Sequence, residues 1–67
     1  MLPSSIDITT NFTDNGKTYY TTNDGDELWA IATANHTSTG YLAIINHLRR
    51  TVGPFSAGKK LIIAINN

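Results

Sequence analysis

The 67-residue sequence contains no cysteine, two prolines and one tryptophan, and its formal net charge is zero. Without cysteine, a disulfide framework and any thiolate-based zinc site are excluded. Without net charge, there is no basic field to gather nucleic acid or an anionic membrane. No stretch approaches the roughly 20 apolar residues of a membrane span, and the start, MLPSSIDITT, lacks the features of a signal peptide. We expect one small domain that binds neither nucleic acid nor membrane.

The charged side chains are unevenly distributed along the chain. All five acidic residues lie at or before position 27, and four of the five basic residues lie after position 48. One interpretation, which we favour, is that the two ends of the chain meet in the fold and compensate each other, as is common in small domains. The other is a molecule with one acidic and one basic end, suited to head-to-tail or ring contacts with complementary neighbours.

Residues 1–16 predict an N-terminal arm that precedes a domain of residues 17–67. The arm has few apolar side chains and ends at an Asn-Gly pair, which is a strong turn signal. Within it, Ile6 and Ile8 alternate with polar residues and Phe12 follows. This pattern is typical of a short extended segment, which could pair with an edge strand of its own or another molecule.

Two strands and two helices are predicted in the domain. The β-branched and aromatic residues of 17–22 predict a strand. Apolar residues at helical spacing predict a helix over 27–34 and a second one that follows a cap at Thr37 or Ser38 and contains Tyr41 to Leu48. Two glycines and a proline predict a loop over 49–58, and alternating side chains predict a strand over 59–65. The order strand, helix, helix, strand places the chain in the α+β class.

The first helix begins in a cluster of acidic residues. Asp26 is predicted as its N-cap, and Glu27 then lies in the first turn, where the helix dipole favours a carboxylate. Trp29 lies next to the apolar stripe of Leu28 and Ile31, so it either packs at the core edge or anchors a partner. We favour the core, because indole side chains are highly buried on average.

The second helix and the last strand carry the remaining apolar residues. Thr37 or Ser38 is predicted to cap the helix. Its apolar stripe consists of Tyr41, Leu42, Ile44, Ile45 and Leu48. In the strand, Leu61, Ile63 and Ile65 are predicted to face one way and Ile62 and Ala64 the other. If both helices cover the first of these faces, the second is an exposed apolar patch.

The acidic cluster is a poor candidate for catalysis. A glycosidase needs two carboxylates about 5 to 9.5 Å apart in a cleft, with one pKa raised by burial. Asp26 and Glu27 are adjacent at a helix start, where the dipole favours the charged form. His36 and His47 are eleven positions apart and lack the spacing of a zinc site. We expect no enzymatic activity, no metal and no cofactor.

The stretch from Tyr20 to Ala64 resembles a LysM domain. In that family a tyrosine strand leads into G-D-T-L-x-x-I-A, followed by L-x-x-x-N and G-x-x-L-x-I-P. The residues that match, at the same spacing, are Tyr20, Gly25, Asp26, Leu28, Ile31, Ala32, Leu42, Asn46, Gly58, Leu61 and Ile63. The resemblance implies a β-α-α-β fold, with two helices packed on one side of a two-stranded antiparallel sheet.

LysM modules typically bind N-acetylglucosamine polymers, peptidoglycan or chitin, in a groove between the loop before the first helix and the loop after the second. The groove residues implied by the resemblance are Gly25, Asp26, Glu27, Leu28, Asn46, Phe55, Ser56, Ala57 and Gly58. Backbone amides and carbonyls would hold the acetamido group above an apolar floor. Glu27 replaces the usual Thr or Ser, which makes the groove bulkier and more charged, and Ala64 replaces the usual Pro.

Stand-alone LysM-like proteins of this size resemble small components of bacteriophage contractile-tail baseplates. The resemblance implies a structural adaptor in the virion that joins hub or tube to wedge proteins, made in the host cytoplasm and present in several copies in a ring. The alternative is a peptidoglycan- or chitin-binding module. Residues expected to contact other baseplate or tail proteins are Ile6, Ile8, Phe12, Trp29, Arg49, Arg50 and Ile62.

Overall fold

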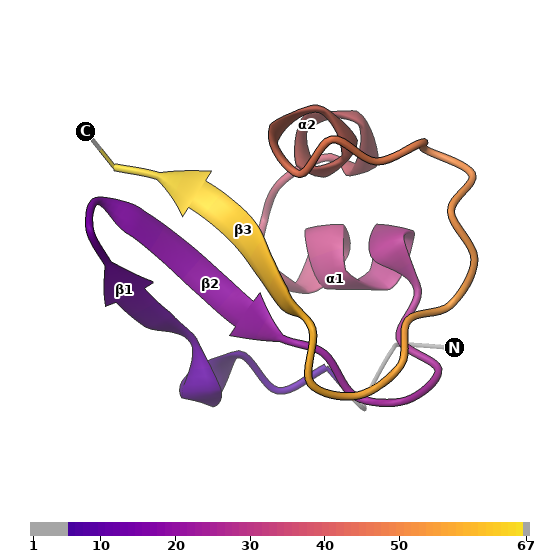
Figure 1. Cartoon of the computed structure of the whole chain (residues 1–67), viewed down its shortest axis with the longest axis horizontal. Coiled ribbons are helices and arrows are strands. Elements are labelled where there is room, and N and C mark those ends of the chain that lie inside the picture. The colour runs from indigo at the N-terminus through magenta and orange to yellow at the C-terminus, as the bar shows by residue number, and fades with distance from the viewer. Residues whose placement is uncertain (1–5, 67) are drawn as a thin grey trace.

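The computed structural model describes residues 6–66, which form two helices and a three-stranded antiparallel sheet (Figure 1). The elements are a 3₁₀ turn η1 (Ile8–Thr10), β1 (Phe12–Asp14), β2 (Lys17–Thr21), α1 (Leu28–Ala34), α2 (Thr39–Ile45) and β3 (Lys60–Ile65). The predicted α+β class is therefore confirmed. Residues 1–5 of the predicted arm lie outside the described residues. Neither helix in the described part is long and apolar enough to cross a membrane.

The sheet has three strands where two were predicted, because part of the predicted arm joins it. Strand β1 pairs antiparallel with β2, so that Phe12 lies opposite Tyr19. The turn between them consists of Asn15 and Gly16, which both adopt positive φ angles, 55° and 82°. Two such residues give a turn whose twist matches that of the flanking strands. The predicted turn is confirmed. Of the predicted extended segment, Ile8 lies in η1 instead, and only Phe12–Asp14 form a strand, which pairs with its own chain.

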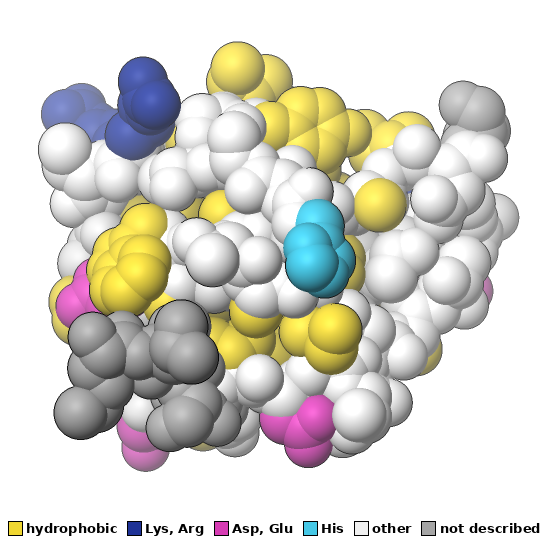
Figure 2. Space-filling model, turned by 180° about the vertical axis from the view of Figure 1, so that it is seen from behind, with side chains coloured by type: hydrophobic (Ala, Val, Ile, Leu, Met, Phe, Trp, Pro, Cys, Tyr) yellow, Lys and Arg dark blue, Asp and Glu magenta, His cyan; other side chains and the backbone are white. Residues whose placement is uncertain are grey.

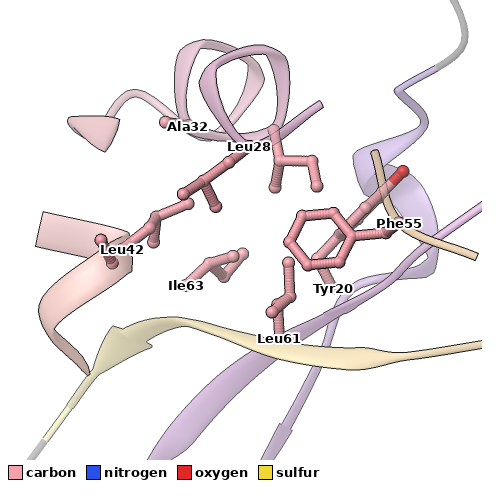
Figure 3. Packing of buried hydrophobic residues seen from close by; sticks show 9 residues of the cluster. Tyr20, Leu28, Ala32, Leu42, Phe55, Leu61 and Ile63 are labelled. Atoms are coloured by element: carbon pink, nitrogen blue, oxygen red, sulfur yellow. The ribbon is translucent and has the colours of Figure 1, made fainter. Parts of the chain in front are cut away.

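The core lies between the sheet and the two helices, which lie on the same side of it (Figure 1). The larger side chains of the core, most of them labelled in Figure 3, are Tyr20 from β2, Leu28 and Ile31 from α1, Leu42 from α2, Phe55 from the long loop, and Leu61 and Ile63 from β3. Because α1 and α2 have only seven residues each, they are too short to be stable alone, and burial against the sheet stabilises them.

Leu61 and Ile63 of β3 are buried as predicted, but a bulge shifts the register of the strand against β2 before Ile65. Tyr19 pairs with Ile62, whereas the preceding residue, Thr18, pairs with Ala64. An extra residue on one strand moves every later side chain to the opposite face. Ile65, predicted to face the core, therefore lies opposite Lys17 and is 45% exposed.

Both helices end at an Asn-His pair. Asn35 and Asn46 are the C-caps, and His36 and His47 follow them with φ angles of 58° and 57°. A left-handed residue directly after the C-cap is the common way for a helix to stop. The histidines are thus helix-end residues. At the other end of α2, the side chain of Ser38 accepts a hydrogen bond from the Tyr41 amide, so Ser38 is the N-cap.

Candidate functional site

Most of the predicted groove residues lie on two segments, 22–27 and 53–59, that are hydrogen-bonded to each other. We call this region the loop junction. The Gly25 amide donates to the Phe55 carbonyl over 2.9 Å, and the Phe55 amide donates to the Asp26 carbonyl, also over 2.9 Å. The two loops thus come together as the resemblance implies, but they bond each other through the backbone.

Thr22 connects the two segments through its backbone and its side chain. Its amide donates to the Lys59 carbonyl, and its carbonyl accepts from the Gly58 amide, both over 2.8 Å. Its hydroxyl donates to the Ser56 carbonyl over 2.6 Å and accepts from the Lys59 amide over 2.9 Å. Thr22 is buried, with 1% exposure. Sequence reasoning missed this residue, since nothing local distinguishes it from its neighbour Thr21.

Asp26 is buried and does not cap α1, contrary to prediction. Its Oδ2 accepts hydrogen bonds from the Tyr20 hydroxyl over 2.5 Å and from the Asn23 amide over 2.9 Å. The N-cap is Glu27, whose side chain makes no capping bond. The physical reason is that Asp26 points back towards β2, where it pairs the one polar atom of a fully buried tyrosine. Burial, and then the hydrogen bond to Asp26, raise the pKa of the Tyr20 phenol above its ordinary value.

Asp24, Gly25 and the 56–58 turn of the loop junction are exposed, but amides of these residues are also used. Oδ1 of Asp24 accepts a hydrogen bond from the Ala57 amide over 2.7 Å. Gly25 and Gly58 have positive φ angles, 86° and 92°, which a side chain would strain. These turns bring the amides of Gly25, Ala57 and Gly58 onto acceptors within the protein, and away from the role of gripping an acetamido group.

Asn46, Leu28 and Phe55 have structural positions. The side-chain amide of Asn46 donates to the carbonyls of Leu42 and Ile62, and its oxygen accepts from the Ile62 amide. It therefore holds the end of α2 against β3 instead of pointing to the loops. Leu28 and Phe55 are buried in the core. Only Gly25, Glu27 and the 56–58 turn remain at the surface.

The described residues offer little that could hold a small molecule or an ion. No pocket is found on the surface that residues 6–66 form. Nor does that part of the chain bring together three or more His, Asp or Glu side chains that could hold a metal.

The outward side of the two helices, which we call the helical face, carries large exposed hydrophobic side chains. Trp29 on α1 is 52% exposed, and Tyr41 and Ile44 on α2 are 40% and 75% exposed. Figure 2 shows hydrophobic side chains spread over this face. Our preference for Trp29 in the core is wrong, because Leu28, Ile31 and the alanines of α1 occupy the buried side of the helix.

Tyr41 and Ile44 were assigned to a buried stripe and are not part of it. The buried residues of α2 are Leu42 and Ala43, with Ile45 and Leu48 packed beside them. The sequence did contain a signal. Apolar residues surround this helix, and a helix that is apolar on all sides requires cover on all sides. The fold covers only one side.

Two arginines lie beside this face. Arg49 and Arg50 are exposed, as a contact role requires. The guanidinium of Arg50 lies against Gly40 in the first turn of α2, so closely that a β-carbon on Gly40 would be 3.4 Å from its Nη2. The exposed Arg50 side chain thus lies against the first turn of α2.

The outer face of the sheet carries Phe12, Tyr19 and Ile62 in one row across the three strands. The rings of Phe12 and Tyr19 stack with centroids 5.3 Å apart, and the ammonium of Lys60 lies 5.9 Å from the centroid of Phe12. Such pairs cover apolar surface within the chain. Tyr19 and Ile62 are accordingly half-buried, so the patch predicted at Ile62 is partly covered.

The predicted contact residues of the arm differ in position. Ile6 is half-buried and packs against the core, whereas Ile8 is exposed. Asn11 joins this segment to the end of α1, because its side-chain amide donates to Oδ1 of Asn35 over 2.9 Å. Residues 6–14 are therefore attached to the domain.

The molecule thus presents two candidate regions of opposite character. The loop junction consists mainly of polar groups bonded to one another, and the helical face consists of apolar groups without cover. No family model, curated protein or solved structure matches this chain.

Proposed function

We propose that the protein is a non-enzymatic structural adaptor that acts through protein–protein contacts. The helical face carries this proposal. Trp29 on α1 and Tyr41 and Ile44 on α2 are large apolar side chains that are exposed in a chain of only 67 residues. Clustered apolar side chains on a small domain mark a surface that another protein covers. Trp and Tyr are also the residues most enriched at the centres of such interfaces.

The setting that fits best is a LysM-like component of a phage contractile-tail baseplate, placed between hub or tube and wedge proteins in the virion. The order of β2, α1, α2 and β3, with both helices on one side of the sheet, supports a LysM-type fold. The roles of Tyr20, Asp26 and Asn46 support it too, because these matching residues tie the elements together. The setting itself is inferred from the resemblance.

The second candidate function is binding of peptidoglycan or chitin. The observation that favours it is that the two groove-forming loops lie side by side. Against it, the amides of Gly25, Phe55 and Ala57 already donate to acceptors of the protein. A sugar would have to replace these hydrogen bonds with its own, so each exchange would add little to the free energy of binding.

Incorporation into tails tests the structural role. We expect mass spectrometry of purified phage tails to find the protein at a fixed ratio to the other tail proteins. The double variant Trp29→Ser, Ile44→Ser should be lost from the particles, whereas the control Ile65→Ser, also at an exposed apolar residue, should remain. Particles that assemble with the double variant in normal amount would refute the role of the helical face.

A glycan titration tests the alternative. We expect backbone amide NMR signals of residues 22–28 and 53–59 to stay unchanged on addition of N-acetylglucosamine hexamer. A natural LysM module serves as the positive control. Saturable shifts confined to these two segments would overturn the proposal and support glycan binding. Asp26→Ala is unsuitable as a binding variant, because the carboxylate is buried and holds Tyr20 and Asn23.

A further inference from the structure

Basic and acidic side chains lie at different edges of the helical face. Figure 2 shows Lys and Arg side chains at its upper left and Asp and Glu side chains at its left and lower edges, with separate groups of hydrophobic side chains at the top, at the left and in the lower centre. Arg49 and Arg50 are exposed after α2, and Asp24 and Glu27 precede α1. Asp26 is excluded from this surface because it is buried. Four of the residues that are segregated by charge along the sequence, Asp24, Glu27, Arg49 and Arg50, thus flank the two helices.

Such a face is complementary to itself. When two copies meet face to face about a two-fold axis, the basic edge of each copy lies on the acidic edge of the other, and the same contact forms twice. The apolar centres then cover each other. Opposite charges around an apolar centre also fix the orientation of the pair and disfavour other partners.

We propose that a second copy of this chain covers the helical face, as a two-fold dimer in which Arg49 and Arg50 meet Glu27 and Trp29 of the other copy. This rests on the proposed structural role, since it names one of the proteins that the adaptor contacts. A guanidinium suits this contact because it bonds a carboxylate and stacks on an aromatic ring. Glu27 makes no capping bond, and Arg50 is already ordered against Gly40.

The dimensions of the face are sufficient. In the view of Figure 2 the Cα trace extends 33 by 25 Å. An interface of standard size buries about 800 Å² of each partner, which a face of these dimensions can supply. The exposed Trp29, Tyr41 and Ile44 would lie within it, and burying them would supply much of the stabilisation.

Sedimentation equilibrium of the full chain is the first test. We expect a monomer–dimer equilibrium whose dissociation constant rises with salt, because the two charged edges are screened. Arg49→Glu with Arg50→Glu should raise this constant at least about tenfold, as should Asp24→Lys with Glu27→Lys. The control Asp14→Lys with Lys60→Glu changes exposed charges on β1 and β3, with Lys60 lying over Phe12 on the outer face of the sheet, and should leave the constant unchanged.

Mixing the two charge variants is the decisive test. One variant is acidic at both edges and the other is basic at both, so each alone repels itself and a 1:1 mixture regains both contacts. We expect a heterodimer in the mixture and a monomer in each separate sample. The recovery also shows that both variants are folded, which loss of dimer alone would not.

Three results would overturn the dimer. They are a wild-type chain that stays monomeric up to its solubility limit, a dimer unaffected by either charge reversal, and a mixture that stays monomeric. A mixture that grows beyond two copies would also overturn the two-fold arrangement and favour head-to-tail contacts. The proposed function would survive any of these if the protein is still found in tails, so the two failures are distinguishable.

Discussion

The loop junction and the helical face lie on the same small domain and differ in how their chemical groups are satisfied. At the loop junction, Thr22 and Asp26 are buried, and their polar atoms are bonded to groups of the same chain. On the helical face, Trp29 and Ile44 are large apolar side chains that expose half or more of their surface. The polar groups of the loop junction find their partners within the monomer, whereas the apolar side chains of the helical face remain exposed in it.

This difference indicates which of the two regions a partner would bind. Buried polar groups cost free energy unless they are paired, so their pairing is required for folding and leaves little for a ligand. Exposed apolar groups contribute little to folding and gain stabilisation only when they are covered. Substitutions at the loop junction should therefore change the stability of the fold, and those on the helical face should change association.

The largest effect expected at the loop junction is at Asp26. Asp26→Ala removes the acceptor of two hydrogen bonds and leaves the buried Tyr20 hydroxyl unpaired. We expect the free energy of unfolding to fall by roughly 2–4 kcal/mol, measured by urea denaturation. The control is Asp24→Ala, whose carboxylate is exposed and accepts one bond from Ala57. Equal losses in the two variants would show that the loop junction is not held by its buried groups.

Thr22→Val should have the next largest effect. The substitution keeps the shape of the side chain and removes the hydroxyl that bonds Ser56 and Lys59. We expect a loss of roughly 1–2 kcal/mol in the free energy of unfolding. Thr21→Val, one position earlier on β2 at a half-buried site, is the matched control and should be within about 0.5 kcal/mol of wild type. If Thr22→Val had the wild-type free energy of unfolding, the Thr22 hydroxyl would not contribute to the stability of the loop junction.

The dependence of stability on alkaline pH isolates the Tyr20 pair. The pKa of Tyr20 is raised in the fold, so the fold favours the neutral phenol. Stability is thus fully present below the ordinary tyrosine pKa of about 10 and is lost as pH rises above it. Urea denaturation between pH 8 and 11 should show this decline in the wild type and a smaller one in Tyr20→Phe. Parallel profiles would contradict the assignment.

A smaller change is expected at the start of α1. Glu27 occupies the N-cap position without a capping bond. Glu27→Thr supplies a hydroxyl of the usual capping kind, which should stabilise the fold by about 0.5–1 kcal/mol. Thermal denaturation at low protein concentration measures this gain. Glu27→Gln, which removes only the charge, is the control. If both variants behave alike, the charge and not the missing cap sets the stability there.

The smallest effect on folding is expected at the helical face. Ile44→Ser should change the free energy of unfolding of the monomer by no more than about 0.5 kcal/mol. Leu42→Ala, on the buried side of the same helix, should cost about 2–5 kcal/mol. Both are measured by urea denaturation at a concentration that keeps the chain monomeric. A large loss in Ile44→Ser would mean that this face belongs to the core, which would abolish the contrast between the two regions.

Much of the fold could be predicted because its signals are local. The Asn15–Gly16 turn and the Ser38 cap each depend on a few neighbouring residues. The order of strands and helices followed from apolar spacing in the same way. The third strand was not foreseen as part of the sheet, since the sequence of the arm did not specify whose edge it would pair with.

The predictions that were wrong, and the residue that was missed, concern properties that depend on distant parts of the chain. Asp26 has the local signature of a cap, but a buried tyrosine hydroxyl on β2 competes for its carboxylate. Ile65 fits perfect alternation, but the bulge opposite Thr18 and Tyr19 is set by pairing between strands. The Thr22 hydroxyl forms hydrogen bonds with residues 56 and 59, and no sequence pattern near Thr22 predicts them.

The pairing of the Asn46 side chain with β3 also affects the solubility of the protein. Strand β3 is at the edge of the sheet, and a free edge invites the strands of other molecules to add to it. The side-chain amide of Asn46 pairs with both the amide and the carbonyl of Ile62, each over 2.8 Å. It occupies the position that the next strand would take. The same side chain that fastens a helix to the sheet thus protects an apolar edge strand from aggregation.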